Sequence, residues 1–313
     1  MSPLENSQYI IVRPSQVHYY AKIPLFHNPT GKEFILYKDH GARLSPQRMI
    51  SSRYPQLYLH NRDRMVALQE AQQIYTVRFL KGLRKKDHVY IKTILSELVT
   101  DLFCEARVGV LQGMFGIAKE SIELLLLDYA GEIVKLAKTV NELDYGSAIH
   151  SVNVMAISLS FCQSMTLDKN TTRDIGLCGL LHDIGKTKVS TDILYANRRL
   201  SPDEFKLIRQ HPENSKKILA EGGLPKNVQQ GALEHHEKLN GHGYPGKTNE
   251  LSFFGRMIGF IDCYEALTCD DRPYRRKLDP YAALHIIKDE TEQGCFDKDI
   301  FKEFVHNIKK QHA

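Results

Sequence analysis

Apolar side chains recur every three or four residues along much of the chain after residue 60. Such a spacing places them on one face of an α-helix, where they can pack against a neighbour. No proline lies between Pro55 and Pro202, and proline is the residue that helices exclude. This interval is therefore predicted to be mostly helical, with one long amphipathic helix over residues 120–143. The clearest apolar stripes are Met65, Leu68, Ala71, Ile74 and Tyr75, followed by Ile91, Ile94, Leu95, Leu98 and Leu102.

The first 60 residues have a different pattern. They contain six of the twelve prolines and two short runs of β-type residues, at 9–12 and 34–37. Residues 28–32, Asn-Pro-Thr-Gly-Lys, have the composition of a turn before the second run. These features predict a small α/β module. With a connector helix it would form a regulatory module over residues 1–140, through which signalling protein partners could bind.

From residue 144 onward the pattern is helix after helix. Ser201 precedes Pro202 and two acidic residues, which is typical of a capped helix N-terminus, and Asp279-Pro280 repeats this start. The predicted fold is therefore mainly α. We expect an all-α helical bundle domain over residues 141–313, preceded by the small α/β module.

The composition limits the class of protein. The chain has 313 residues, of which 42% are apolar and 25% charged, as in a soluble globular protein. Its net charge of +5 is mild and its basic residues are mostly scattered, which argues against a reader of nucleic-acid polymers. The sequence shows no signal peptide and no apolar run of about 18 residues that would span a membrane. The six cysteines form no CxxC pair and are expected to be reduced, so the predicted location is the cytoplasm.

Residues 179–186, with the sequence GLLHDIGK, carry the first sign of chemistry. The apolar start reads as the end of a buried helix, which places His182 and Asp183 side by side in a core. A buried carboxylate without a partner is very costly, so a cation or a hydrogen-bonding network must lie beside it. An isolated His-Asp pair more often only caps a helix. Here, further candidate ligands in helical, apolar or glycine-punctuated segments favour a metal site: His150, His211, His235, His236 and Asp262.

Apart from the adjacent pairs His182-Asp183 and His235-His236, these residues lie too far apart in the sequence to share a ligand sphere by local spacing. A site built from them needs several helices that converge in a bundle core. Nitrogen and oxygen ligands without a thiolate suit iron, manganese or zinc better than magnesium or calcium. The adjacent pairs His182-Asp183 and His235-His236 point in different directions on a helix, which suits two neighbouring metals bridged by Asp183. A purely structural helical bundle would leave this set of polar groups unexplained.

The motifs HDIGK, HPENS, HHEKLNGHGYPG and DCYEALTCDDRPYR resemble, in order and spacing, the signatures of the HD-GYP family. This family is a branch of the HD metal-dependent phosphohydrolases that degrades cyclic di-GMP, and the resemblance covers residues 144–300. It implies hydrolysis of cyclic di-GMP to linear pGpG, with GMP as a further product, by a hydroxide activated by two divalent metal ions. Iron is the expected metal, with manganese as the alternative. The implied metal ligands are His150, His182, Asp183, His211, His235, His236 and Asp262.

The resemblance also implies which residues act on the substrate. Asp183 and Lys186 would be catalytic, with Lys186 close to the substrate phosphate. Tyr244, in the Gly-Tyr-Pro sequence that names the family, would lie beside the substrate pocket. Arg272 and Arg275 would bind substrate phosphates.

The chain departs from the family pattern at three places. Gly146 stands where some members have an acid that binds a third metal. Ten positions separate Asp262 from Arg272, whereas the family usually has nine. Lys247-Thr248 replaces the usual glycine and leucine after Gly-Tyr-Pro. These differences leave an alternative, a catalytically degenerate domain that binds cyclic di-GMP or a protein partner without turnover.

Overall fold

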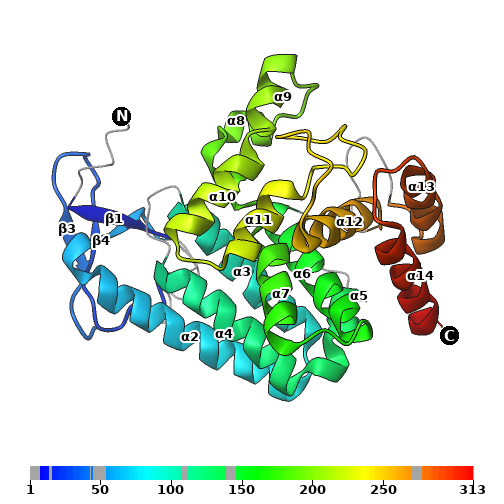
Figure 1. Ribbon diagram of the computed structural model, residues 1–313. Coiled ribbons are helices and arrows are strands. Elements are labelled where there is room, and N and C mark those ends of the chain that lie inside the picture. The colour runs from blue at the N-terminus through cyan, green and yellow to red at the C-terminus, as the bar shows by residue number, and fades with distance from the viewer. Residues whose placement is uncertain are drawn as a thin grey trace. The chain divides into compact units, whose positions relative to one another are not determined.

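Helices dominate the protein, and a small antiparallel sheet lies near its N-terminus, as predicted (Figure 1). The computed structural model describes residues 8–13, 16–42, 44, 54–106, 112–138, 146–268 and 277–312. The chain divides into two compact units, Met1–Leu80 and Lys81–Ala313. Compactness is a different criterion from the limits of a family domain, so the boundary near residue 140 stays a prediction.

The first unit contains a four-stranded sheet with the order β1-β4-β2-β3, in which every pairing is antiparallel. The predicted run at 9–12 is β1, and the run at 34–37 is β3, displaced by one residue. The pattern did not reveal β2 and β4, which are only three and four residues long. The strands are β1 (Tyr9–Val12), β2 (Leu25–His27), β3 (Ile35–Lys38) and β4 (Leu57–His60).

Helix α2 (Arg64–Lys85) follows the sheet after a 3₁₀ turn, η2 (Asn61–Asp63). Within the first unit, the Glu70 carboxylate accepts hydrogen bonds from the backbone amides of Ala21 and Lys22. The buried ring of Tyr75 meets the ring of Tyr19 edge to face. These contacts tie the helix to the loop before β2.

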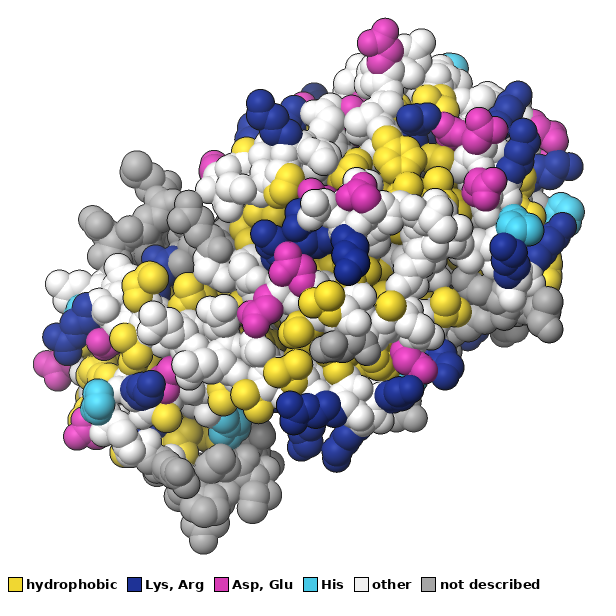
Figure 2. Space-filling view, turned by 60° about the horizontal axis from the view of Figure 1, so that its bottom comes forward, with side chains coloured by type: hydrophobic (Ala, Val, Ile, Leu, Met, Phe, Trp, Pro, Cys, Tyr) yellow, Lys and Arg dark blue, Asp and Glu magenta, His cyan; other side chains and the backbone are white. Residues whose placement is uncertain are grey.

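Helices are the only regular elements among the described residues of the second unit. Its charged surface residues on the face shown in Figure 2 are of both signs and interspersed, as the mild net charge suggests. The helices are α3 (His88–Ala106), α4 (Gln112–Asp128), η3 (Ala130–Glu132), α5 (Ile133–Lys138), α6 (Ser147–Ser164), α7 (Lys169–Leu181), η4 (Ile184–Lys188), α8 (Thr191–Leu194), α9 (Pro202–Ile208), α10 (His211–Glu221), α11 (Lys226–Glu234), α12 (Phe253–Thr268), α13 (Pro280–Glu292) and α14 (Lys298–His312). No helix in the described parts of the chain is both long and apolar enough to cross a membrane.

Helix α6 forms the centre of the bundle, because residues on every side of it from Ile149 to Cys162 are buried. Its neighbour α7 packs closely against it, and Gly179 makes this approach possible. A Cβ at Gly179 would lie 3.1 Å from the backbone of Met155. The close packing brings the C-terminal end of α7, and with it His182 and Asp183, against α6. The predicted capped starts at Ser201 and Asp279 are confirmed as the N-caps of α9 and α13.

The prediction of one long helix over 120–143 is wrong. Helix α4 ends at Asp128, and Tyr129 leaves the helical conformation with φ −133° and ψ 12°. Its ring is buried, and Gly131 follows, so the local sequence favours a turn over a continued helix. The short helix α5 then begins at Ile133, and residues 139–145 lie outside the described part.

Candidate metal centre

The seven predicted metal ligands lie together in the second unit, delivered by five helices. His150 lies in α6, His211 is the first residue of α10, and Asp262 lies in α12. His182 and Asp183 follow the end of α7, whereas His235 and His236 follow the end of α11. The side chains of His236 and Asp262 are partly exposed, at 28% and 13%, and the other five are buried. The site is therefore a core cluster with one open side.

Asp183 occupies the middle of this cluster. Its Oδ1 atom lies 3.2 Å from Nε2 of His211 and 3.9 Å from Nε2 of His235. Its Oδ2 atom lies 3.5 Å from Nε2 of His182 and 3.7 Å from Nε2 of His150. The two oxygens of one carboxylate thus face two different pairs of histidines, which is the arrangement that a bridging ligand needs.

Asp262 supplies the second carboxylate. Its Oδ1 atom lies 3.0 Å from Nε2 of His150 and 3.9 Å from Nε2 of His182, and its Oδ2 atom lies 3.9 Å from Nδ1 of His236. Burial raises the pKa of both Asp183 and Asp262, but nearby cations and histidines outweigh this effect. The net result holds both pKa values well below the ordinary range, so both groups are charged at neutral pH.

Main-chain carbonyls fix the orientation of three of the histidine rings. Nδ1 of His182, His211 and His235 each donates to the carbonyl of the residue three positions earlier, at 2.8 Å. A carbonyl can only accept, so Nδ1 carries the proton, and in a neutral ring Nε2 is left with a lone pair. Burial lowers the pKa of His182 and His235, which keeps these two rings neutral.

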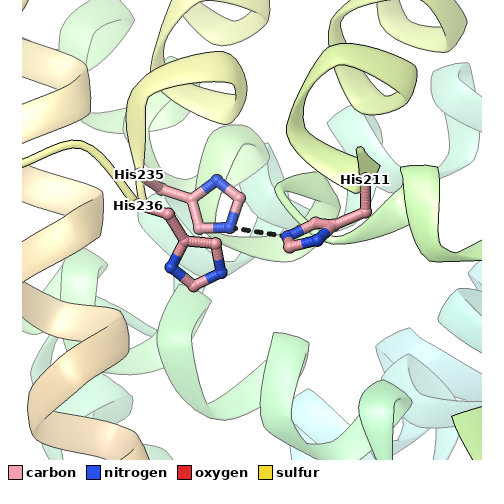
Figure 3. Close-up of side chains that lie close together, drawn as sticks. All are labelled: His211, His235 and His236. Atoms are coloured by element: carbon pink, nitrogen blue, oxygen red, sulfur yellow. Dashed lines mark hydrogen bonds between the residues drawn. The ribbon is translucent and has the colours of Figure 1, made fainter. Parts of the chain in front are cut away.

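The Nε2 atoms of the histidines point at one another. Figure 3 shows His211 facing His235, with their Nε2 atoms 3.2 Å apart. The Nε2 atoms of His150 and His182 are 3.3 Å apart. Since Nδ1 of His211 and of His235 donates to a carbonyl, it is the Nε2 atom of each ring that faces the centre of the cluster and could bind a cation. This donor set fits divalent metal ions.

Three groups of these residues have ligand atoms within 4.8 Å of one another, close enough to share an ion. None of the three groups contains a cysteine, in agreement with the predicted nitrogen and oxygen ligand set. The groups are His211, His235 and His236; His150, His182 and Asp183; and His182, His235 and Asp262.

Glu265 is a member of the site to which the sequence assigned no role. Its Oε2 atom lies 2.6 Å from Nδ1 of His150, and its Oε1 atom accepts from Asn153 at 2.7 Å. Burial lowers the pKa of His150, but Glu265 and Asp262 outweigh this and raise it to about 10. A carboxylate behind a ligand histidine fixes the ring and strengthens it as a metal ligand. The available signal was that Glu265 lies one helical turn after Asp262 and is the only other acid of α12.

Lys186 lies at the edge of the cluster, with Nζ 2.5 Å from Oδ2 of Asp183 and with its side chain 26% exposed. The turn that carries it is held by Ser215, whose hydroxyl donates to the His182 carbonyl and accepts from the Gly185 amide. Lys186 is therefore the one described lysine at the open side of the site that contacts a candidate ligand.

The Gly-Tyr-Pro loop covers another side of the cluster. The ring of Tyr244 packs against the ring of His236, with the centroids 4.7 Å apart and the planes tilted by 31°, and its backbone amide donates to the His236 carbonyl. Glu237 holds the end of the loop by accepting from the amides of Gly246 and Lys247, at 2.5 and 3.0 Å. Tyr244 thus lies beside the candidate centre, and its place beside a substrate pocket stays a prediction. Arg272 and Arg275 lie outside the described residues.

The chain is similar to known proteins over most of its length. The family model described as the HD domain matches residues 122–300. A protein of Pseudomonas aeruginosa named as a cyclic di-GMP phosphodiesterase is 33% identical over 67% of this chain and 51% of its own. A Vibrio cholerae protein named as a 3′3′-cGAMP-specific phosphodiesterase is 27% identical over 72% of this chain and 49% of its own. The chain thus spans about half the length of these curated relatives.

Among solved structures, one is described as an HDG"Y"P protein from Bdellovibrio bacteriovorus. It matches with a TM-score of 0.60 and covers 96% of this chain and 99% of that one. The two sequences are only 15% identical, so this likeness concerns the fold alone.

Proposed function

The chain belongs to the HD-GYP branch of the HD-domain family, and from this premise we propose that it hydrolyses a phosphodiester bond of cyclic di-GMP. One observation supports the proposal above all others. Four histidine Nε2 atoms lie within 3.9 Å of the Asp183 carboxylate, from segments far apart in the sequence. Such a cluster is costly in a protein core unless cations bind there.

The cofactors of the proposed enzyme are two divalent ions, with iron first and manganese as the alternative. His150, His182 and Asp262 would hold one ion, and His211, His235 and His236 the other, with one oxygen of Asp183 toward each. Two such ions supply electrostatic stabilisation of phosphate charge and make water a nucleophile at neutral pH. Gly146, the N-cap of α6, has no side-chain oxygen to offer, and this favours two ions over three.

The protein's own side chains would position the metal ligands, stabilise charge and bind the substrate. Asp183 would hold the two groups of ligands together, because one of its oxygens faces His150 and His182 and the other faces His211 and His235. Lys186, whose ammonium group reaches the open side, would stabilise the negative charge that develops on the attacked phosphate. Tyr244 would form one wall of the substrate pocket, and Arg272 and Arg275 would bind phosphates. The expected product is linear pGpG, and GMP would form only by a second cleavage.

The test combines metal analysis of the purified full chain with a chromatographic assay of cyclic di-GMP hydrolysis. Bound metal with release of pGpG supports the proposal. Bound metal and bound cyclic di-GMP without turnover would instead indicate the degenerate binding domain. Parallel assays with 3′3′-cGAMP compare the two candidate substrates, because one matching relative is named for cyclic di-GMP and another for 3′3′-cGAMP.

A further inference from the structure

An apolar recess lies between α8 and α9. The two helices lie beside α10, which carries His211 (Figure 1). Its apolar lining includes Ile193, Leu194, Tyr195, Pro202, Phe205 and Ile208, and Asn197, Arg198, Arg199 and Ser201 also line it. Ile208 connects it to the centre, because the same residue that lines the recess accepts the Nδ1 hydrogen bond of His211 through its carbonyl. Ile208 is therefore shared between the wall of the recess and the hydrogen bond that orients a candidate metal ligand.

Arg209 lies at the end of α9 and contacts Phe205, a residue that lines this recess. Its guanidinium carbon lies over the ring of Phe205, 5.0 Å from the centroid, and over the ring of Tyr244, at 4.9 Å. Phe205 lines the recess, and the ring of Tyr244 packs against the ring of His236. Arg209 thus lies between the apolar recess and the metal centre, with aromatic contacts to both sides.

The guanidinium group has no hydrogen bond or ion pair with any described residue. The nearest acid of α9, Glu204, is occupied by Arg198, at 2.5 and 2.8 Å. Aromatic contacts hold the planar guanidinium group in place without using its N–H donors. Arg209 therefore offers a fixed fork of donors to a ligand, and the surface beside it is apolar and suited to a flat ring.

We propose that the recess and Arg209 form a subsite for one guanine base of the dinucleotide. The base would pack against Phe205, and the guanidinium fork would donate to O6 and N7 of guanine, a pairing that adenine cannot match because it has a donor at position 6. This inference rests on the proposed function, since it assumes a cyclic dinucleotide at the centre. It assigns base selectivity to a residue that contacts none of the candidate metal ligands directly.

The experiment measures the dissociation constants of cyclic di-GMP and cyclic di-AMP for the full-length, metal-loaded protein by equilibrium dialysis. A Lys186→Ala background slows turnover during the measurement. Arg209→Ala should weaken cyclic di-GMP binding roughly tenfold or more and leave cyclic di-AMP nearly unchanged. Arg209→Lys should resemble Arg209→Ala, because lysine keeps the charge but lacks the fork. Lys206→Ala removes an exposed charge from the same helix and should change neither constant.

An equal loss of affinity for both nucleotides would show that Arg209 binds phosphate, which overturns the base subsite. An unchanged affinity for both would also overturn it. The proposed function can fail separately: the unaltered protein would then bind neither nucleotide and release no pGpG. Metal content, measured on every variant, should stay equal, because Arg209 holds no ion.

Discussion

Asp183 connects both halves of the candidate centre, since each of its oxygens faces a different pair of histidines. Asp183→Asn removes the negative charge that would hold two cations. We expect the variant to lose bound metal and to unfold at a lower temperature, because metal binding contributes to the free energy of folding. Elemental analysis and thermal denaturation measure the two effects. Asp203→Asn, an exposed acid on α9, is the control, and full metal occupancy in Asp183→Asn would contradict the bridging role.

Lys186 should act on the substrate and not on the metal. Lys186→Ala removes the ammonium group at the open side of the site but no ligand atom. Turnover should fall roughly 100-fold, because the lost charge stabilises chiefly the transition state, while metal content stays unchanged. The rate constant and the metal content are measured together, with Lys188→Ala on the same turn as the control. An unaltered rate constant would remove Lys186 from the catalytic residues.

The positions of the candidate ligands depend on contacts between helices. The clearest example is the packing of η4 against α10. A Cβ at Gly185 would overlap the His211 carbonyl oxygen and the Ser215 backbone nitrogen. Gly185→Ala should therefore separate Asp183 from His211, lowering both the unfolding temperature and the metal content. Gly116→Ala, in α4, is the matched control, because its Cβ would meet nothing within 4 Å and alanine favours a helix. Equal unfolding temperatures for both variants would contradict the prediction.

The contact between α6 and α12 gives a second prediction at this scale. Glu265 holds Nδ1 of His150 while Asp262, one turn earlier on α12, faces Nε2 of the same ring. Glu265→Gln keeps the shape but removes the charge, and metal affinity should fall roughly 10- to 100-fold. Competition with a chelator of known affinity measures this. The exposed Glu292→Gln on α13 should have no effect, and an unchanged affinity in Glu265→Gln would restrict its role to packing.

Local patterns predicted the elements well and the contacts between them poorly. The end of α7 and the caps at Ser201 and Asp279 follow from short-range rules and were predicted. The pattern did not predict the end of α4 before Tyr129. A buried tyrosine fits the apolar spacing of a helix, so the spacing alone does not distinguish a helix from a turn at this position. The contact between His150 and Asp262 spans more than a hundred residues, so no spacing rule could show it. The family resemblance predicted that these residues belong together, and Glu265, outside the quoted ligand set, gained a role only from the structure.

At the scale of the whole molecule, the metal should stabilise the two units unequally. All seven candidate ligands lie in the unit Lys81–Ala313, where they join five helices, and none lies in the unit Met1–Leu80. Removal of metal with a chelator should therefore leave a cluster of buried carboxylates and closely spaced histidine nitrogens in one unit only. Hydrogen–deuterium exchange measures the effect by segment. We expect faster exchange in residues 147–162 and 211–235 and unchanged exchange in residues 54–80.

The Asp183→Asn variant is the control for this experiment, since a protein that cannot hold metal should not respond to the chelator. Its exchange without chelator should match that of the chelated unaltered protein. If the chelator raised exchange equally in both units, metal would stabilise the chain as one cooperative body. If it raised exchange in neither, the cluster would be stable without cations, and the repulsion between its facing nitrogens would have to be relieved by protonation, which makes its stability depend on pH instead of on metal.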